Sequence, residues 1–446
     1  MREMMRDQLP LMQAFVEHEH AQELAGMSEA LDQCRDVLDH GERDLLRGRD
    51  PLLGRPGLSA EQVIRALVVK QLNGFSYEEL AFHLADSTCY RRFCRLGGLE
   101  KPPGRSTLQE NIKSLSAETL EAINRCLLGW AKRIGVEKGE IVRGDCTTVE
   151  STIHAPTDSW LLWDTVRVLV RVLKRCREYG VEFSDRTRRV KRRWRAIGNA
   201  RNREERLPLY RDLLRLTEET LEAATRAVWR LASIADAEAQ GSRVILQHHV
   251  VLGRRVVDQT HRRVLESEVV PSREKIVSIF EPHTDIIVSG RPEIGYGHKV
   301  CLTTGRSSMI LDCVVLEGNP ADSTLATDMI TRHREIYDAV PLAVTFDGGF
   351  ASKANLTELK AMGVAAVAFS KRCGMSIHEM VTESWIYKRL RDFRAGIEGC
   401  ISFLKRCFGM RRCGWKGFAS FKAYVWSSIL SANLLILARH RMAAAP

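Results

Sequence analysis

Two acidic residues in this chain stand at the ends of apolar segments, where a charge is costly unless it is paired, hydrogen-bonded or bound to metal. PLAVTFDGGF (341–350) leads into Asp347 and two glycines, and IVRG leads into Asp145 before the polar CTT. We expect both acids at the carboxyl ends of strands, where the chemistry of an open α/β sheet gathers. If the two strands are neighbours, the two carboxylates can share a cation.

A third acid lies in RAGIEGCISFLKRCFG (394–409), which has the periodicity of a helix. At about 100° per residue, Arg394, Glu398 and Lys405 lie on one stripe of this helix. An adjoining apolar stripe that begins at Ile397 would dock the helix on a sheet, so Glu398 is expected at the edge of the buried face. A surface glutamate in an i,i+4 salt bridge with Arg394 is the alternative.

Three carboxylates from two strands and a helix suit Mg²⁺ or Mn²⁺, which prefer oxygen ligands and bind phosphates. Two such ions would activate an attacking oxygen and stabilise the leaving one in phosphodiester chemistry. The sequence therefore predicts Asp145, Asp347 and Glu398 as catalytic, metal-binding residues. Three further side chains are predicted to support them: His298, Lys299 and Asp322. No GxxxxGK[ST] loop is present, which argues against an NTPase.

The charge of the chain favours a polyanionic partner. Its 446 residues include 67 lysines and arginines against 56 acids, a net charge of +11. The densest basic segment is RTRRVKRRWRAIGNARNREER (186–206), and it suits a phosphate backbone, although a solvated helix face is the alternative. We predict five DNA-binding residues in this segment: Arg188, Arg189, Lys191, Arg192 and Arg193.

The N-terminal third of the chain predicts short helices. Ser59 and Gln62 form a capping-box pattern, and Gly74 is a plausible end for the first helix. Further helices are expected after Ser76, over STCYRRFCRLG and from Ser106. The short connections between these helices and their outward-facing arginines favour a helix-turn-helix-like DNA-binding domain at residues 54–135. A helical segment is expected before it, at residues 1–53. An ordinary helical bundle is the alternative.

The remaining residues, 136–446, predict an α/β domain with a mixed sheet flanked by helices. Strands are expected from Gly139, over SRVILQHHVVLGRRVVD through KIVSIF, in a hairpin over YGHKVCLTTGRSSMILDCVVLEG, and in VPLAVTF and VAAVAFS on either side of a helix. After the first strand, a basic helical insertion is expected at about 156–240. The apolar segment YVWSSILSANLLILA is short for a bilayer span and indicates a packed helix.

No secretory signal is evident at the start MREMMRDQLPLMQ, and the twelve cysteines have no CxxC pair. We therefore expect reduced thiols, a cytoplasmic protein and no membrane partner.

GDCTTVES, VTFDGGF and RAGIEGCISFLKRCFG resemble the three blocks of DDE insertion-sequence transposases with a ribonuclease H-like core. In the cut-and-paste branch the third block runs Tyr, two residues, Arg, three, Glu, six, Lys. Arg394, Glu398 and Lys405 keep this spacing, whereas Arg391 stands at the tyrosine position and Tyr387 lies one turn earlier. The segment from Gly54 to Ser87 is similar to the helical domain that opens many such transposases.

The resemblance implies two Mg²⁺ or Mn²⁺ ions bound by Asp145, Asp347 and Glu398, with Asp145 bridging them. It implies that Arg394 and Lys405 hold DNA phosphate near the scissile bond. The implied function is a bacterial transposase that acts in the cytoplasm, on the nucleoid when bound to DNA. It would bind terminal inverted repeats as a dimer and transfer 3′-hydroxyl ends to target DNA. Two alternatives are a ribonuclease H-like nuclease or resolvase without strand transfer, and a DNA-binding regulator without catalysis.

Overall fold

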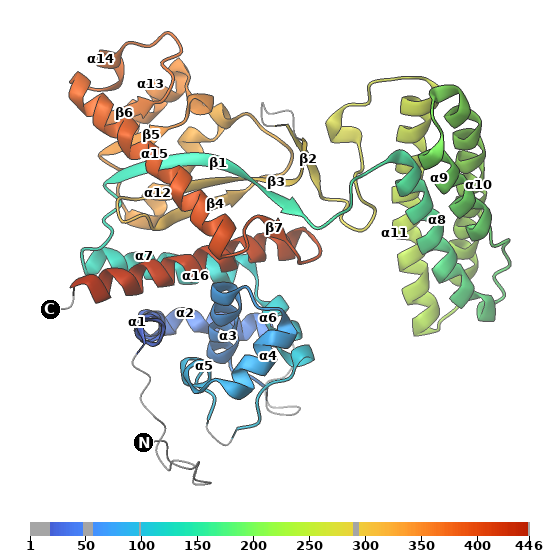
Figure 1. The fold of residues 1–446 in the computed structure, drawn as a ribbon, viewed down its shortest axis with the longest axis horizontal. Coiled ribbons are helices and arrows are strands. Elements are labelled where there is room, and N and C mark those ends of the chain that lie inside the picture. Colours follow the sequence, from blue (N-terminus) through green and yellow to red (C-terminus); the bar gives the residue numbers. More distant parts are fainter. Residues whose placement is uncertain (1–17, 48–56, 98–99, 289–293, 445–446) are drawn as a thin grey trace, which may run out of the picture.

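The computed structural model describes residues 18–47, 57–97, 100–288 and 294–444, and it confirms a mixed α/β fold with a helical N-terminal region (Figure 1). Within the predicted N-terminal segment, α1 (Glu19–Asp32) and α2 (Arg35–Leu46) are helical. The rest of that segment, 1–17 and 48–53, lies outside the described residues, as does the expected start of the next domain at 54–56.

The predicted N-terminal helices are present, and their caps explain where they begin. Helix α3 (Ala60–Asn73) starts at a capping box between Ser59 and Gln62 and ends at Gly74, whose φ of 67° is left-handed. It is followed by α4 (Tyr77–Asp86), α5 (Thr88–Phe93), α6 (Arg105–Ser114) and α7 (Ala117–Arg133). Their apolar faces belong to the same core as the sheet.

The sheet has seven strands and mixed direction, with the order β2 (Asp285–Val288), β3 (Ile294–Thr304), β1 (Ile141–Ser151), β5 (Ala343–Phe346), β6 (Ala366–Phe369). Strand β4 (Ile310–Val315) pairs with β3, which confirms the predicted hairpin, and β7 (Arg412–Cys413) pairs with β1. Strands β5 and β6 run parallel to β1 and are joined through α13 (Lys353–Ala361), as the alternation of apolar runs predicts.

Helix α15 (Ser384–Cys407) crosses one face of β1, β5 and β6 (Figure 1). The apolar stripe that begins at Ile397 is buried as predicted, and it continues through Leu404 to Phe408 at the end of the helix. Helix α12 (Ala326–Tyr337) packs on β4 and α13 on β6, while the short α14 (Ile377–Met380) precedes α15. The helix that should carry the third acid therefore lies directly over the strands that carry the first two.

Helix α16 (Phe418–Ala444) joins the N-terminal helices to the sheet. It packs against α1, α3, α7 and β4, and Asn433 accepts a hydrogen bond from the Ile310 N–H. It is the one helix among the described residues that is long and apolar enough to cross a membrane, but 89% of its most apolar window is buried inside the protein. It is the packed core helix that the sequence indicates.

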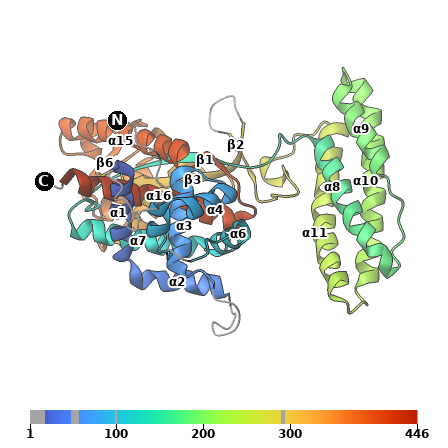
Figure 2. The same cartoon turned by 60° about the horizontal axis from the view of Figure 1, so that its bottom comes forward.

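The chain segment between β1 and β2 forms a separate bundle of four helices: α8 (Asp158–Arg175), α9 (Thr187–Asn199), α10 (Arg203–Leu231) and α11 (Ala237–Thr260). Figures 1 and 2 both show this bundle to one side of the sheet. Its apolar residues make two clusters of their own, apart from the main core.

The strand predicted over SRVILQHHVVLGRRVVD is wrong, because these residues lie in α11. Its β-branched residues favoured a strand, but the buried positions Leu246, Val250 and Gly253 recur at helical spacing. KIVSIF is not a strand either; Ile276 and Ile279 pack into the core of the bundle.

Candidate active site

The register of β1 and β5 brings two predicted acids side by side. Gly144 is paired with Phe346, so Asp145 and Asp347 are the next residues on neighbouring parallel strands. Gly144 is required for this register, since a Cβ there would lie 2.4 Å from the Phe346 ring. The prediction that Asp145 ends its strand is wrong: β1 continues to Ser151 because it stays paired with β3. It is β5 that ends, which leaves Asp145 open on that side.

Arg394 joins the three predicted carboxylates. Its Nη2 atom lies 3.4 Å from Asp145 Oδ2, 3.1 Å from Asp347 Oδ1 and 3.5 Å from Glu398 Oε1. The side chains of Arg394 and Asp145 are each 16% exposed, whereas that of Glu398 is 69% exposed. The two strands and the helix thus direct three carboxylate oxygens toward one cationic atom. The i,i+4 salt bridge between Glu398 and Arg394, which the sequence offered as the alternative for this glutamate, is present as part of this cluster.

The two aspartates have different electrostatic surroundings. Burial raises the pKa of Asp145, and nearby Asp347 adds to this effect, against the opposing contributions of the Cys146 N–H and Arg394. Burial alone would raise the pKa of Asp347 as well. However, hydrogen bonds from Ser370 and the Gly348 N–H, with the charge of Arg394, lower the pKa of Asp347 overall. A cation beside Asp145 would offset the cost of its buried charge.

The chemistry of these donors fits a divalent cation, because three carboxylates are hard oxygen ligands of the kind that Mg²⁺ and Mn²⁺ bind. Across the described ranges, no group of three carboxylate, histidine or cysteine side chains is already close enough together to hold a metal ion. The oxygens are arranged instead around the guanidinium of Arg394. For Asp145, Asp347 and Glu398 to bind an ion together, Arg394 must move aside.

The two glycines after Asp347 make room for side chains. A Cβ on Gly348 would lie 2.7 Å from Lys371 Cγ, and one on Gly349 would lie 2.6 Å from Asp322 Oδ2. Asp322 Oδ1 in turn pairs with Lys299 Nζ at 2.5 Å. The predicted supporting residues Lys299 and Asp322 therefore form one ion pair at the border of the carboxylate site.

His298 lies elsewhere. It is paired with Val149, four residues beyond Asp145 along β1, and its Nε2 is 2.7 Å from His283 Nδ1. Its Nδ1 lies 3.0 Å from Asp285 Oδ2, and the side chain is buried. None of these contacts involves the three carboxylates, so the structure does not bring His298 to the site as predicted.

The remaining residues of the third block have distinct places on or beside α15. Lys405 is half-buried near the end of the helix, past Glu398. Tyr387 is buried, and its hydroxyl donates to the Phe369 carbonyl oxygen at 2.8 Å, while Arg391 at the family's tyrosine position is exposed. Tyr387 therefore anchors the start of α15 to β6.

The basic segment forms α9, and only part of its charge is available to a partner. Arg188, Lys191, Arg192 and Arg195 recur at i, i+3, i+4 and i+7, are exposed and have no ion pair among the residues described; we call them the outer stripe. The opposite side of α9 is buried through Val190 and Ile197.

Two of the five predicted DNA-binding residues face another helix instead. Arg189 Nη2 lies 2.8 Å from Asp212 Oδ1, and Arg193 Nε lies 2.6 Å from Asp212 Oδ2. The predicted DNA-binding role of Arg189 and Arg193 is therefore weakened, because Asp212 of α10 already neutralises part of their charge. Trp194 packs against Trp160, with ring centroids 4.6 Å apart.

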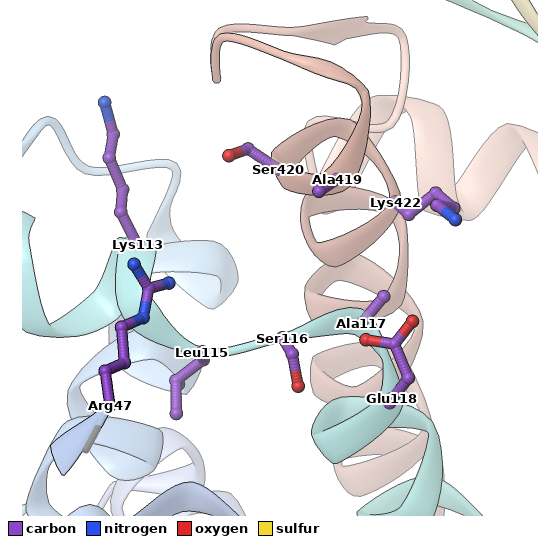
Figure 3. A pocket seen from close by; sticks show the side chains of 9 residues that line it. All are labelled: Arg47, Lys113, Leu115, Ser116, Ala117, Glu118, Ala419, Ser420 and Lys422. Carbon is purple, nitrogen blue, oxygen red and sulfur yellow. The ribbon is translucent and has the colours of Figure 1, made fainter. Parts of the chain in front are cut away.

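A surface pocket of about 130 Å³ lies apart from the carboxylates, between the N-terminal helices and the start of α16 (Figure 3). Arg47 and Lys113 line one side, and Lys422 of α16 lies across from them. None of the predicted site residues lines this pocket.

Two residues around the site were missed from the sequence. Ser370 follows β6 and donates to Asp347 Oδ1 at 2.8 Å. Arg143 is a buried arginine within the apolar start of β1, and it contacts α15. A charged residue inside IVRG was the signal for Arg143, whereas nothing local marks Ser370.

Comparison with known protein families finds two matching domains. Residues 289–434 match the model of the transposase DDE domain, and residues 13–114 match a transposase domain (DUF772). Asp347 and Glu398 lie within the first range, while Asp145 lies outside both. Searches of curated proteins and of solved structures gave no match.

Both matched domains are transposase domains, and the mixed sheet flanked by helices agrees with the ribonuclease H-like core of DDE transposases. With the matched transposase domains at both ends, the chain belongs to the DDE transposases of insertion sequences.

Proposed function

We propose that this transposase cleaves the ends of its element with Asp145, Asp347 and Glu398 as metal ligands and joins the freed 3′-hydroxyls to target DNA. The observation that carries this proposal is the approach of all three carboxylates to Arg394 Nη2, within 3.5 Å. Side chains that surround one cation in this way can surround another. When bound, two Mg²⁺ or Mn²⁺ ions would polarise the attacking oxygen and stabilise the leaving one.

The residues of the chain have separable tasks in this proposal. Asp145 and Asp347 follow paired residues on neighbouring strands and both approach Arg394 of α15; the bridging role of Asp145 is the one that the family resemblance implies. Arg394, once released from the carboxylates, and Lys405 would hold DNA phosphate near the scissile bond. The ion pair of Lys299 and Asp322 would keep the loop after β5 in place beside the site.

DNA would be held by two helical regions. Helices α3 to α7 would bind the terminal inverted repeats, and the outer stripe of α9 would contact the phosphate backbone, where lysines and arginines supply affinity without reading sequence. We expect the active form to be a dimer on DNA in the bacterial cytoplasm, since both ends of the element must be cut.

Asp347→Ala tests the site. We expect the variant to bind terminal-repeat DNA like the wild type and to lose Mg²⁺-dependent strand cleavage. Asp392→Ala is the matched control, because Asp392 is an exposed acid on α15 that has no ion pair with the site's arginine. Undiminished cleavage by Asp347→Ala would refute the assignment.

A joining assay separates a transposase from a ribonuclease H-like nuclease. A pre-cleaved terminal-repeat duplex is incubated with plasmid and Mn²⁺, and we expect covalent insertion of the duplex into the plasmid. Cleavage without joining would favour the nuclease, and neither reaction would favour a DNA-binding regulator.

A further inference from the structure

Arg143 of β1 contacts β3, the turn between β3 and β4, and helix α15 beside the candidate site. It is 5% exposed, and its Nε donates to Thr304 Oγ1 of β3 at 2.8 Å. Its Nη1 donates to the Phe393 carbonyl oxygen of α15 at 2.8 Å, and its guanidinium lies 4.5 Å from the centroid of the Phe393 ring. Its Nη2 reaches Ser308 Oγ at 3.2 Å and Cys400 Sγ at 3.5 Å.

None of these contacts is a carboxylate, and Arg143 has no ion pair within the described part of the chain. A buried charge without a counter-charge is costly, so packing alone does not account for an arginine here. What the guanidinium provides is a planar fork whose donors are fixed relative to one another. Such a fork sets how two elements are oriented.

Helix α15 is shaped to receive this fork. A Cβ on Gly396 would lie 2.0 Å from Arg143 Nη1 and 2.9 Å from its Cζ. Gly399, one turn further along the same helix, has nothing within 4 Å of an added Cβ. Only the glycine that faces Arg143 is therefore required by the packing.

The contacts of Arg143 determine which way α15 presents its other faces. Phe393, Gly396 and Cys400 recur at i, i+3 and i+7 and face Arg143, so Arg394 and Glu398 fall on the next stripe of the helix. On β1, Arg143 and Asp145 are two residues apart and therefore lie on the same side of the sheet.

We propose that Arg143 is a positioning residue that fixes the rotation and height of α15, so that Glu398 reaches the same point as Asp145 and Asp347. This inference rests on the proposed function. In this proposal, the relative positions of the three carboxylate ligands depend on a residue that contacts none of them.

The test compares two glycine-to-alanine variants of the full chain by Mn²⁺ titration, followed by electron paramagnetic resonance. We expect Gly396→Ala to raise the Kd for Mn²⁺ by about 10- to 100-fold, because loss of a residue that orients a metal ligand typically weakens metal binding by this amount. We expect Gly399→Ala to bind Mn²⁺ like the wild type. Thermal unfolding of both variants separates a local effect from loss of the fold.

A double-mutant cycle removes the ambiguity of a poorly folding variant. Arg143→Met alone should also weaken Mn²⁺ binding, and adding Gly396→Ala to it should weaken binding little further, because both changes break the same contact. Additive losses of affinity, or a wild-type Kd for Gly396→Ala, would overturn the positioning role alone. A wild-type chain that binds no Mn²⁺ would overturn the metal assignment of the proposed function, and this inference with it.

Discussion

Arg394→Gln should make the transposase bind Mn²⁺ more tightly in the absence of DNA. Arg394 Nη2 lies within 3.5 Å of three carboxylate oxygens and so takes the position of a shared counter-ion. An ion that binds the same carboxylates must compete with this guanidinium. Glutamine keeps much of the side chain's length and removes the charge, so the competition disappears.

The size of the effect follows from the three ion pairs. An exposed pair is worth about 0.2–1 kcal/mol, and here Asp347 is 42% and Glu398 69% exposed, so neither pair exceeds that range. The pair with Asp145 is more buried and lies at the upper end. Together they give about 1–3 kcal/mol, which corresponds to a Kd for Mn²⁺ about 5- to 150-fold lower in the variant.

Isothermal titration calorimetry of the DNA-free protein with Mn²⁺ measures this change. Arg391→Gln is the control, since Arg391 lies on the same helix one turn earlier, is exposed and has no ion pair with the three acids. Equal or weaker Mn²⁺ binding by Arg394→Gln would show that the arginine does not compete with the ion, and the reasoning would fail.

Three further predictions concern the bundle and the sheet. Changing the outer stripe to glutamine should reduce the slope of log affinity for DNA against log salt by about 0.9 for each phosphate that the protein no longer neutralises, whereas Arg189→Gln with Arg193→Gln should change it less. Asp212→Asn should destabilise the protein to urea by about 1–2 kcal/mol at neutral pH. Burial alone would raise the pKa of Asp212, but its ion pairs with arginines outweigh burial and lower the pKa to about 2. The difference in stability between the wild type and Asp212→Asn should therefore vanish as the pH falls from 3.8 to about 2. Gly144→Ala should cost about 1–3 kcal/mol in urea unfolding, because the Phe346 ring must shift.

Much of the fold could be predicted because its signals are local. The capping box at Ser59 needs only four residues, and the docking stripe of α15 needs only its own periodicity. Asp347 and Glu398 were found because a charge that follows or borders an apolar segment stands out. Both carboxylates approach Arg394, in agreement with the expectation that the two acids lie close together.

The errors arose where distant residues decide the outcome. β1 continues past Asp145 because β3, more than 140 residues later in the chain, stays paired with it. Arg189 looked available until Asp212 of another helix was placed beside it. Helix α11 was mistaken for a strand because its β-branched content competed with its spacing, and packing within the bundle favoured the helix.

The central claim is that Asp145, Asp347 and Glu398 bind divalent cations together. Anomalous diffraction from crystals of the transposase grown with Mn²⁺ and terminal-repeat DNA tests it most directly. We expect manganese peaks ligated by all three side chains, with Arg394 turned away from them. Manganese bound elsewhere, with these carboxylates still around Arg394, would contradict the account.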